Sequence, residues 1–132
     1  MRYLLDTNII SDFIRNPKGR VANQIRRVGR QAVFTSVIVA AELRFGVAKN
    51  GSLAFERRVE ETLQALEVAP FESPADATYG AIRANLEKQG NPIGGNDLFI
   101  AAHALTLGST LVTANEREFA RIDGLKFENW LR

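Results

Sequence analysis

The stretch "YLLDTNIIS", residues 3–11, joins two patterns of different period at one acidic residue. The run Tyr3–Leu5 is apolar, which predicts a short buried strand over residues 2–5. Apolar residues return at helical spacing from Ile9 onward, which predicts a helix from Thr7 to about Arg15. Asp6 stands between the two. Asp is a preferred helix cap, and open parallel sheets place their binding sites at this kind of junction.

The same alternation of strand and helix patterns continues along the chain. Further strands are predicted over residues 31–35, 67–71, 110–113 and 126–129. Further helices are predicted over residues 20–29, 36–49, 52–66, 73–89, 96–108 and 115–120. Strands that alternate with helices are typical of parallel sheets covered on both faces. We therefore expect an α/β fold, a three-layer α/β/α sandwich with a central parallel sheet, built as one domain over residues 1–132.

Several chemistries are excluded by composition. The chain has no cysteine, so disulfides, thiol catalysis and thiolate zinc sites are ruled out. His103 is the only histidine, and it follows Asp97 by six residues on the same predicted helix, pointing away from it. We expect His103 to be a packed or interface residue, and Trp130 to be a core or dimer contact. No signal peptide and no membrane-length apolar run are found, so a cytoplasmic protein without a membrane partner is expected.

Charge is distributed unevenly, although the formal net charge is only +2. The segment between Phe13 and Ala41 contains no Asp or Glu but six basic residues: Arg15, Lys18, Arg20, Arg26, Arg27 and Arg30. A block of one sign can attract a polyanion, and it can equally be a solvated helix face. Arginine outnumbers lysine 13 to 4, which favours phosphate or carboxylate partners because the guanidinium group binds both bidentately.

Four acidic residues fall where a parallel sheet would form a site: Asp6, Glu42, Asp97 and Glu118. Each alone is explained as a helix cap or a solvated residue. Together they would repel one another, by roughly 4 kcal/mol for two charges about 4 Å apart at an effective dielectric constant of 20. Such a cluster takes up protons or binds a cation, and an all-oxygen set favours Mg²⁺ or Mn²⁺. Mg²⁺ held by carboxylates is suited to phosphodiester hydrolysis.

Four segments together resemble a known family: "LLDTN" at 4–8, "AELRFG" at 41–46, "PIGGNDLFIAAHA" at 92–104 and "LVTANEREFARIDGL" at 111–125. In this order they are similar to the PIN-domain ribonucleases, and more narrowly to the toxin component of VapBC-type toxin–antitoxin modules. The resemblance implies a Mg²⁺-dependent endoribonuclease, with Mn²⁺ as a possible substitute, that cleaves structured RNA such as tRNA. It also implies a homodimer and inhibition by a cognate small antitoxin protein.

The resemblance also implies roles for individual residues. Asp6, Glu42 and Asp97 would converge on one metal ion, with metal contact mainly through Asp6 and Asp97. Many relatives have an acid where this chain has Asn115, so we expect Glu118 to be the fourth acid and Asn115 to be a neutral ligand or orienter. With less negative charge there, a second metal would bind weakly or only with RNA. The groups expected to hold the carboxylates in place are Thr7, Asn8 and Thr113, together with Asn115.

RNA binding is expected to rest on the basic segment, through Arg26, Arg27 and Arg30, because the acidic site itself repels phosphates. Other phosphate chemistries fit less well. A haloacid-dehalogenase-type phosphatase would need a second Asp where Asn8 stands, and neither the acid pair nor the late lysine of a response-regulator receiver is present. A non-catalytic RNA-binding or scaffold protein on the same fold remains the alternative from another functional class.

Overall fold

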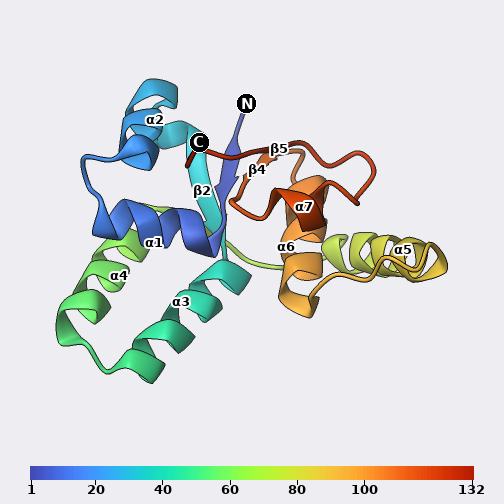
Figure 1. Cartoon of the computed structure of the whole chain (residues 1–132), viewed down its shortest axis with the longest axis horizontal. Helices are drawn as coiled ribbons and strands as arrows, with labels where there is room; N and C mark the ends of the chain where they lie inside the picture. Colours follow the sequence, from blue (N-terminus) through green and yellow to red (C-terminus); the bar gives the residue numbers. More distant parts are fainter.

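Five parallel strands form one sheet in the computed structural model, which describes residues 1–132 (Figure 1). In chain order the strands are β1 (Tyr3–Leu5), β2 (Val33–Ser36), β3 (Glu67–Ala69), β4 (Thr110–Val112) and β5 (Phe127–Glu128). Their order across the sheet is β3-β2-β1-β4-β5. The predicted parallel sheet is therefore confirmed.

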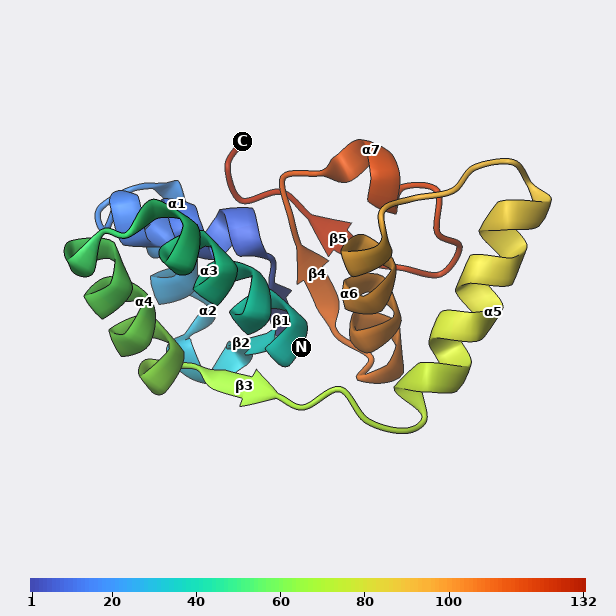
Figure 2. The same cartoon turned by 90° about the horizontal axis from the view of Figure 1, so that it is seen from below.

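Helices cover both faces of this sheet (Figures 1 and 2). One group lies on one side: α1 (Thr7–Arg15), α2 (Arg20–Val28), α3 (Val37–Asn50) and α4 (Leu53–Ala65). The other side carries α6 (Gly95–Thr106), with α5 (Ala75–Lys88) packed against the outer side of α6 and the short α7 (Glu116–Phe119) nearby. The expected three-layer α/β/α sandwich is confirmed. No helix has both the length and the apolar character needed to cross a membrane.

The central strands form the middle of a core cluster of 27 buried apolar residues. Leu4 of β1 pairs in register with Phe34 of β2 on one side and with Leu111 of β4 on the other, and all three are fully buried. Strands buried on both faces need continuous apolar runs rather than alternating apolar and polar residues. This explains why Tyr3–Leu5 is apolar throughout. The edge strands β3 and β5 are more exposed.

The strands that pair with β1 lie on its two opposite sides, and the chain reaches them by separate connections. It reaches β2 through α1 and α2, and it later returns to β4, on the other side of β1, through α5 and α6. Such a reversal of strand order opens a crevice at the carboxyl ends of the two strands. The backbone N–H of Asp6 donates to the carbonyl of Val112 at 2.9 Å, so Asp6 is held at this reversal point, between β1 and β4.

Several predicted boundaries differ from the structure: among the ends, β3 stops at Ala69 rather than residue 71 and α6 stops at Thr106 rather than residue 108, and three starts also differ. The strand expected from residue 31 begins at Val33, because residues 30–32 form a short 3-10 turn after Gly29. The helix expected from Ser73 begins at Ala75, with Pro74 in the cap position and no side-chain cap hydrogen bond. The helix expected to start at Asn96 or Asp97 has Gly94 as its N-cap and begins at Gly95. Asp97 therefore lies within the first turn of α6.

Candidate active site at the carboxyl ends of β1 and β4

Asp6 is both the cap of α1 and one corner of the site. Its Oδ1 accepts the backbone N–H of Thr7 at 2.8 Å, and its Oδ2 accepts the hydroxyl of Thr113 at 2.7 Å. The residue is 5% exposed. Burial raises the pKa of Asp6 above its usual value, the negative charge of Glu42 adds to this, and the two hydrogen bonds oppose it. Capping thus engages only one of the two carboxylate oxygens.

Glu42 reaches the site from the second turn of α3. The hydroxyl of Thr7 donates to its Oε1, and the side-chain amide of Asn96 donates to its Oε2 at 3.1 Å. Both oxygens of Glu42 are therefore directed by neighbours. Asn96 was not predicted from the sequence. Its place directly before Asp97, in the first turn of α6, is the signal that could have pointed to it.

Asp97 and Glu118 are bridged by Asn115. The Asn115 side-chain amide donates to Asp97 Oδ2 at 3.1 Å and to Glu118 Oε2 at 2.9 Å. The backbone N–H of Asn115 donates to the Thr113 hydroxyl at 3.0 Å, and that hydroxyl in turn donates to Asp6. A chain of hydrogen bonds thus links Asp6 to the other two acids through two neutral side chains.

The charges of the four acids act on one another. Burial, followed by the hydrogen bond with Glu118 and the negative charges of Asp6, Glu118 and Glu42, raises the pKa of Asp97 to about 7. The hydrogen bond with Asp97 lowers the pKa of Glu118, and the amide of Asn115 lowers it further. Asp97 therefore binds a proton more readily than Glu118 does. The structure brings together all four acids that were singled out from the sequence.

The negative charge of this cluster is not balanced by ion pairs. The ion pairs of the structure lie elsewhere, between Arg2 and Glu67, Arg44 and Glu60, Arg83 and Glu87, and Arg132 and Glu116. The side chains in the cluster offer carboxylate, amide and hydroxyl oxygens only. This donor chemistry fits a hard divalent cation such as Mg²⁺ or Mn²⁺.

The structure does not show Asp6, Glu42 and Asp97 already converged on one ion position, so their convergence stays a prediction. No three acidic or histidine side chains are arranged so that they could hold an ion together. Like charges repel at short range, and Glu42 is drawn instead to Thr7 and Asn96. Mg²⁺ in proteins is usually held by one or two carboxylates and keeps several waters. The pair Asp6 and Asp97 therefore remains compatible with a metal site.

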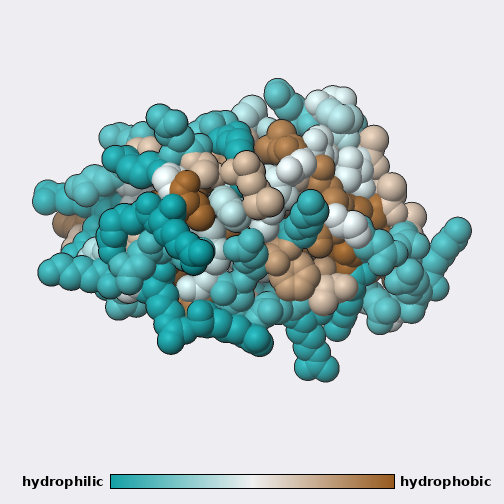
Figure 3. Space-filling model, turned by 90° about the horizontal axis from the view of Figure 1, so that it is seen from above, coloured by the Kyte–Doolittle hydropathy of each residue, from teal (hydrophilic) through white to brown (hydrophobic).

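Two other expected groups are not brought to the acids. Asn8 is exposed, and the carboxylates take their hydrogen bonds from other side chains. Arg26 and Arg27 lie in the last turn of α2, and Arg30 lies in the turn that leads into the amino end of β2. These arginines are therefore at the opposite end of the sheet from the acids (Figure 1). The surface at that end is predominantly hydrophilic over the α2 half of the molecule (Figure 3).

His103 and Trp130 are packing residues, as expected. His103 is 1% exposed, its Nδ1 lies 2.8 Å from Ser36 Oγ, and its ring contacts Phe71 edge-on. Burial lowers the pKa of His103, so the ring is neutral at physiological pH. Trp130 is buried against Tyr3, with ring centroids 5.2 Å apart.

Comparison with known proteins agrees with this geometry. A family model described as "PIN domain" matches residues 3–125. The chain belongs to the PIN-domain family. This PIN domain is 38% identical over 132 residues to "Ribonuclease VapC2" of Rickettsia felis, covering 98% of each chain. It is 36% identical over 133 residues to "tRNA(fMet)-specific endonuclease VapC" of Salmonella typhimurium, again covering 98% of each chain.

The fold of this PIN domain is also close to a solved structure. It superposes with a TM-score of 0.91 on the crystal structure of VapBC2 from Rickettsia felis bound to a DNA fragment from the promoter. Sequence identity is 37%, over 98% of this chain and 99% of that one. The resemblance to VapC-type ribonucleases, predicted from the four motifs, is confirmed.

Proposed function

We propose that this PIN domain is a Mg²⁺-dependent endoribonuclease and the toxin of a type II toxin–antitoxin system, with residues 1–132 acting as one catalytic domain. The observation that carries the proposal is the cluster of Asp6, Glu42, Asp97 and Glu118, which no lysine or arginine balances by an ion pair. Relatives named ribonuclease and tRNA(fMet)-specific endonuclease support RNA, with tRNA foremost, as the substrate. An RNA substrate of this kind favours the cytoplasm as the compartment.

Asp6 and Asp97 are the proposed metal ligands. A bound Mg²⁺ would supply a water of lowered pKa and would offset negative charge at the phosphorus. Asp6 is prepared for this role because Thr7 and Thr113 hold its two oxygens in place. Asp97 carries a proton near neutral pH without a cation, and a positive charge beside it would favour the ionised form.

Glu42 and Glu118 are the proposed acids that orient the attacking water. Thr7 and Asn96 fix the two oxygens of Glu42. Glu118 keeps a lowered pKa, so its carboxylate can accept a hydrogen from water. Asn115 takes the place of an acid and donates to both Asp97 and Glu118 without adding charge, so we propose that a second metal binds weakly or only with RNA.

Two partners complete the proposal, a cognate antitoxin and a second copy of this chain. The antitoxin is supported by a solved VapBC2 complex, one chain of which is similar to this chain over 98% of its length. Two large apolar side chains on the α3–α4 hairpin are exposed: Phe45 on α3 is 67% exposed and Leu53 on α4 is 74% exposed. Exposed apolar side chains of this kind are consistent with contacts to a partner protein. Light scattering of the purified chain tests the homodimer directly.

The function is tested by mapping RNA 5′ ends after brief induction of the chain in cells. The wild type should produce new 5′ ends at one or a few sites in structured RNA. Asp6→Asn should produce none, while its N-cap and fold are retained because Asn caps helices as well as Asp. The same new ends in both strains, or none in the wild type, would contradict a ribonuclease and favour a non-catalytic RNA-binding or scaffold role.

A further inference from the structure

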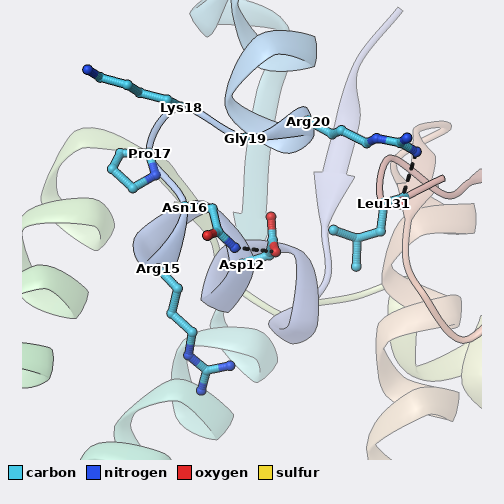
Figure 4. A pocket seen from close by; sticks show the side chains of 8 residues that line it. All are labelled: Asp12, Arg15, Asn16, Pro17, Lys18, Gly19, Arg20 and Leu131. Atoms are coloured by element: carbon cyan, nitrogen blue, oxygen red, sulfur yellow. Dashed lines mark hydrogen bonds between the residues drawn. The ribbon is translucent and has the colours of Figure 1, made fainter.

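A hollow of about 580 Å³ lies between the end of α1 and the start of α2 (Figure 4). Its lining includes three basic side chains, Arg15, Lys18 and Arg20, and also Leu131, whose carbonyl faces Arg20. The three basic residues come from the part of the chain that has no Asp or Glu between Phe13 and Ala41. The hollow is therefore a concave surface with a positive rim.

The positive charge of the rim is available to a ligand. Arg15, Lys18 and Arg20 are exposed, and none of them forms an ion pair. Arg20 makes only a long contact, 3.5 Å, with the Leu131 carbonyl. The single acid of the lining is Asp12, whose Oδ1 accepts the side-chain amide of Asn16 at 2.9 Å. The lining thus keeps two net positive charges.

The three basic side chains spread outward from the α1–α2 turn and do not close on one point (Figure 4). A single small anion would be bound best by groups that converge on it. Cations spaced along a surface instead match successive phosphates of a strand, where one charge follows another at about 3.4 Å.

α1 connects this hollow to the acids. The helix begins at Thr7, directly after its N-cap Asp6, and ends at Arg15; its nine residues span roughly 13 Å at 1.5 Å per residue. Asn8, Asp12 and Arg15 are spaced four and three residues apart and so share one face of α1. A stacked strand would cover that length in about four nucleotides. Arg26, Arg27 and Arg30 lie at the far end of the sheet and lack such a connection.

We propose that the hollow formed by Arg15, Lys18 and Arg20 binds backbone phosphates of the RNA strand a few nucleotides from the cleaved bond. The proposal rests on the proposed ribonuclease function and adds to it the surface that holds the substrate. It replaces Arg26, Arg27 and Arg30 as the RNA-binding set. Attraction in the hollow offsets the repulsion between RNA and the acids at the other end of α1.

The test compares two triple variants that lose equal charge from the same segment. One is Arg15→Gln with Lys18→Gln and Arg20→Gln, and the matched control is Arg26→Gln with Arg27→Gln and Arg30→Gln. Binding of a fluorescent 12-nucleotide oligouridylate is measured in chelator at several salt concentrations. The hollow variant should bind roughly tenfold or more weakly at low salt and lose about two units of salt slope, three contacts at about 0.7 each, while the control changes little.

A third variant moves affinity in the opposite direction. Asp12→Asn removes the only negative charge of the lining and keeps the oxygen that accepts from Asn16, so RNA should bind severalfold more tightly. A gain of affinity cannot arise from misfolding. Unchanged affinity and salt slope in the folded hollow variant, or equal losses in both triple variants, would overturn the proposal.

Cleavage separates this proposal from the function on which it rests. The hollow variant should show a raised KM and a nearly unchanged kcat, because its residues do not touch the reacting phosphate. A wild type that binds through the hollow but cleaves no RNA would refute the ribonuclease and leave the hollow in place. Cleavage with the same KM in wild type and hollow variant would refute the hollow alone.

Discussion

Burial and the neighbouring carboxyl groups raise the pKa of Asp97 from 3.8 to about 7 on folding. Between these values the folded protein holds a proton that the unfolded chain has lost. The free energy of unfolding therefore decreases as pH rises through this window. The raised pKa of Asp6 acts in the same direction.

Asp97→Asn should remove most of this pH dependence. In chelator, the wild type should lose more stability than the variant between about pH 5 and pH 8, by roughly 1–2 kcal/mol after allowing for solvent screening of a partly exposed group. Thermal unfolding at both pH values measures the difference. Parallel stability curves for the two proteins would show that Asp97 titrates normally.

Thr113 links two parts of the site through one buried hydroxyl. It donates to Asp6 Oδ2 and accepts the backbone N–H of Asn115. Thr113→Val keeps the shape of the side chain but removes the hydrogen-bond partner of Asp6 Oδ2 and of the Asn115 backbone N–H. We therefore expect a loss of about 1–3 kcal/mol in the free energy of unfolding, and reduced cleavage. Thr113→Ser, which keeps the hydroxyl, should retain most of the stability and most of the cleavage activity. Denaturant unfolding and single-turnover cleavage test the pair, and a Val variant as active as Ser would exclude the positioning role.

At the scale of elements, the sequence predicted the helices and strands well where a local signal marks them. The junction at Asp6 is an example, because an apolar run, a capping side chain and helical spacing coincide within a few residues. The predicted boundaries were wrong where backbone geometry decides at which residue a helix or strand begins. Gly94 and Gly95 let α6 start before Asp97, and Gly29 turns the chain with φ 96° into a 3-10 turn before β2.

The turn between α3 and α4 depends on one left-handed residue. Gly51 follows α3 with φ 65°, and a Cβ there would meet no neighbouring atom within 4 Å. Gly51→Ala should therefore cost about 1–2 kcal/mol from backbone strain alone. Gly46→Ala is the matched control, because Gly46 lies inside α3 with equal space and the change should stabilise by about 0.5–1 kcal/mol. Opposite shifts in melting temperature are expected, and equal shifts would contradict the backbone explanation.

At the scale of the whole molecule, the order of the strands could not be predicted from local patterns. β4 lies next to β1 although more than a hundred residues separate them, and this pairing places Thr113 and Asn115 beside Asp6. The four acids could be proposed because they fall at the carboxyl ends of predicted strands or in the helices that follow them, and because the motifs around them resemble a family. Asn96 was missed, because its only signal in the sequence is its place directly before Asp97. Arg26, Arg27 and Arg30 were predicted because their segment is basic and contains no acid, but α1 and α2 place them at the opposite end of the sheet from Asp6.

Metal-dependent RNA cleavage by the purified chain tests the role of the acidic cluster most directly. Single-turnover cleavage of tRNA is measured for the wild type and Asp6→Asn, each with Mg²⁺ and with chelator. We expect cleavage only by the wild type with Mg²⁺, at a rate at least about a hundredfold above the other three conditions, since a metal-held nucleophile and charge neutralisation are lost together. Undiminished cleavage in chelator, or by Asp6→Asn with Mg²⁺, would contradict a metal site built on these acids.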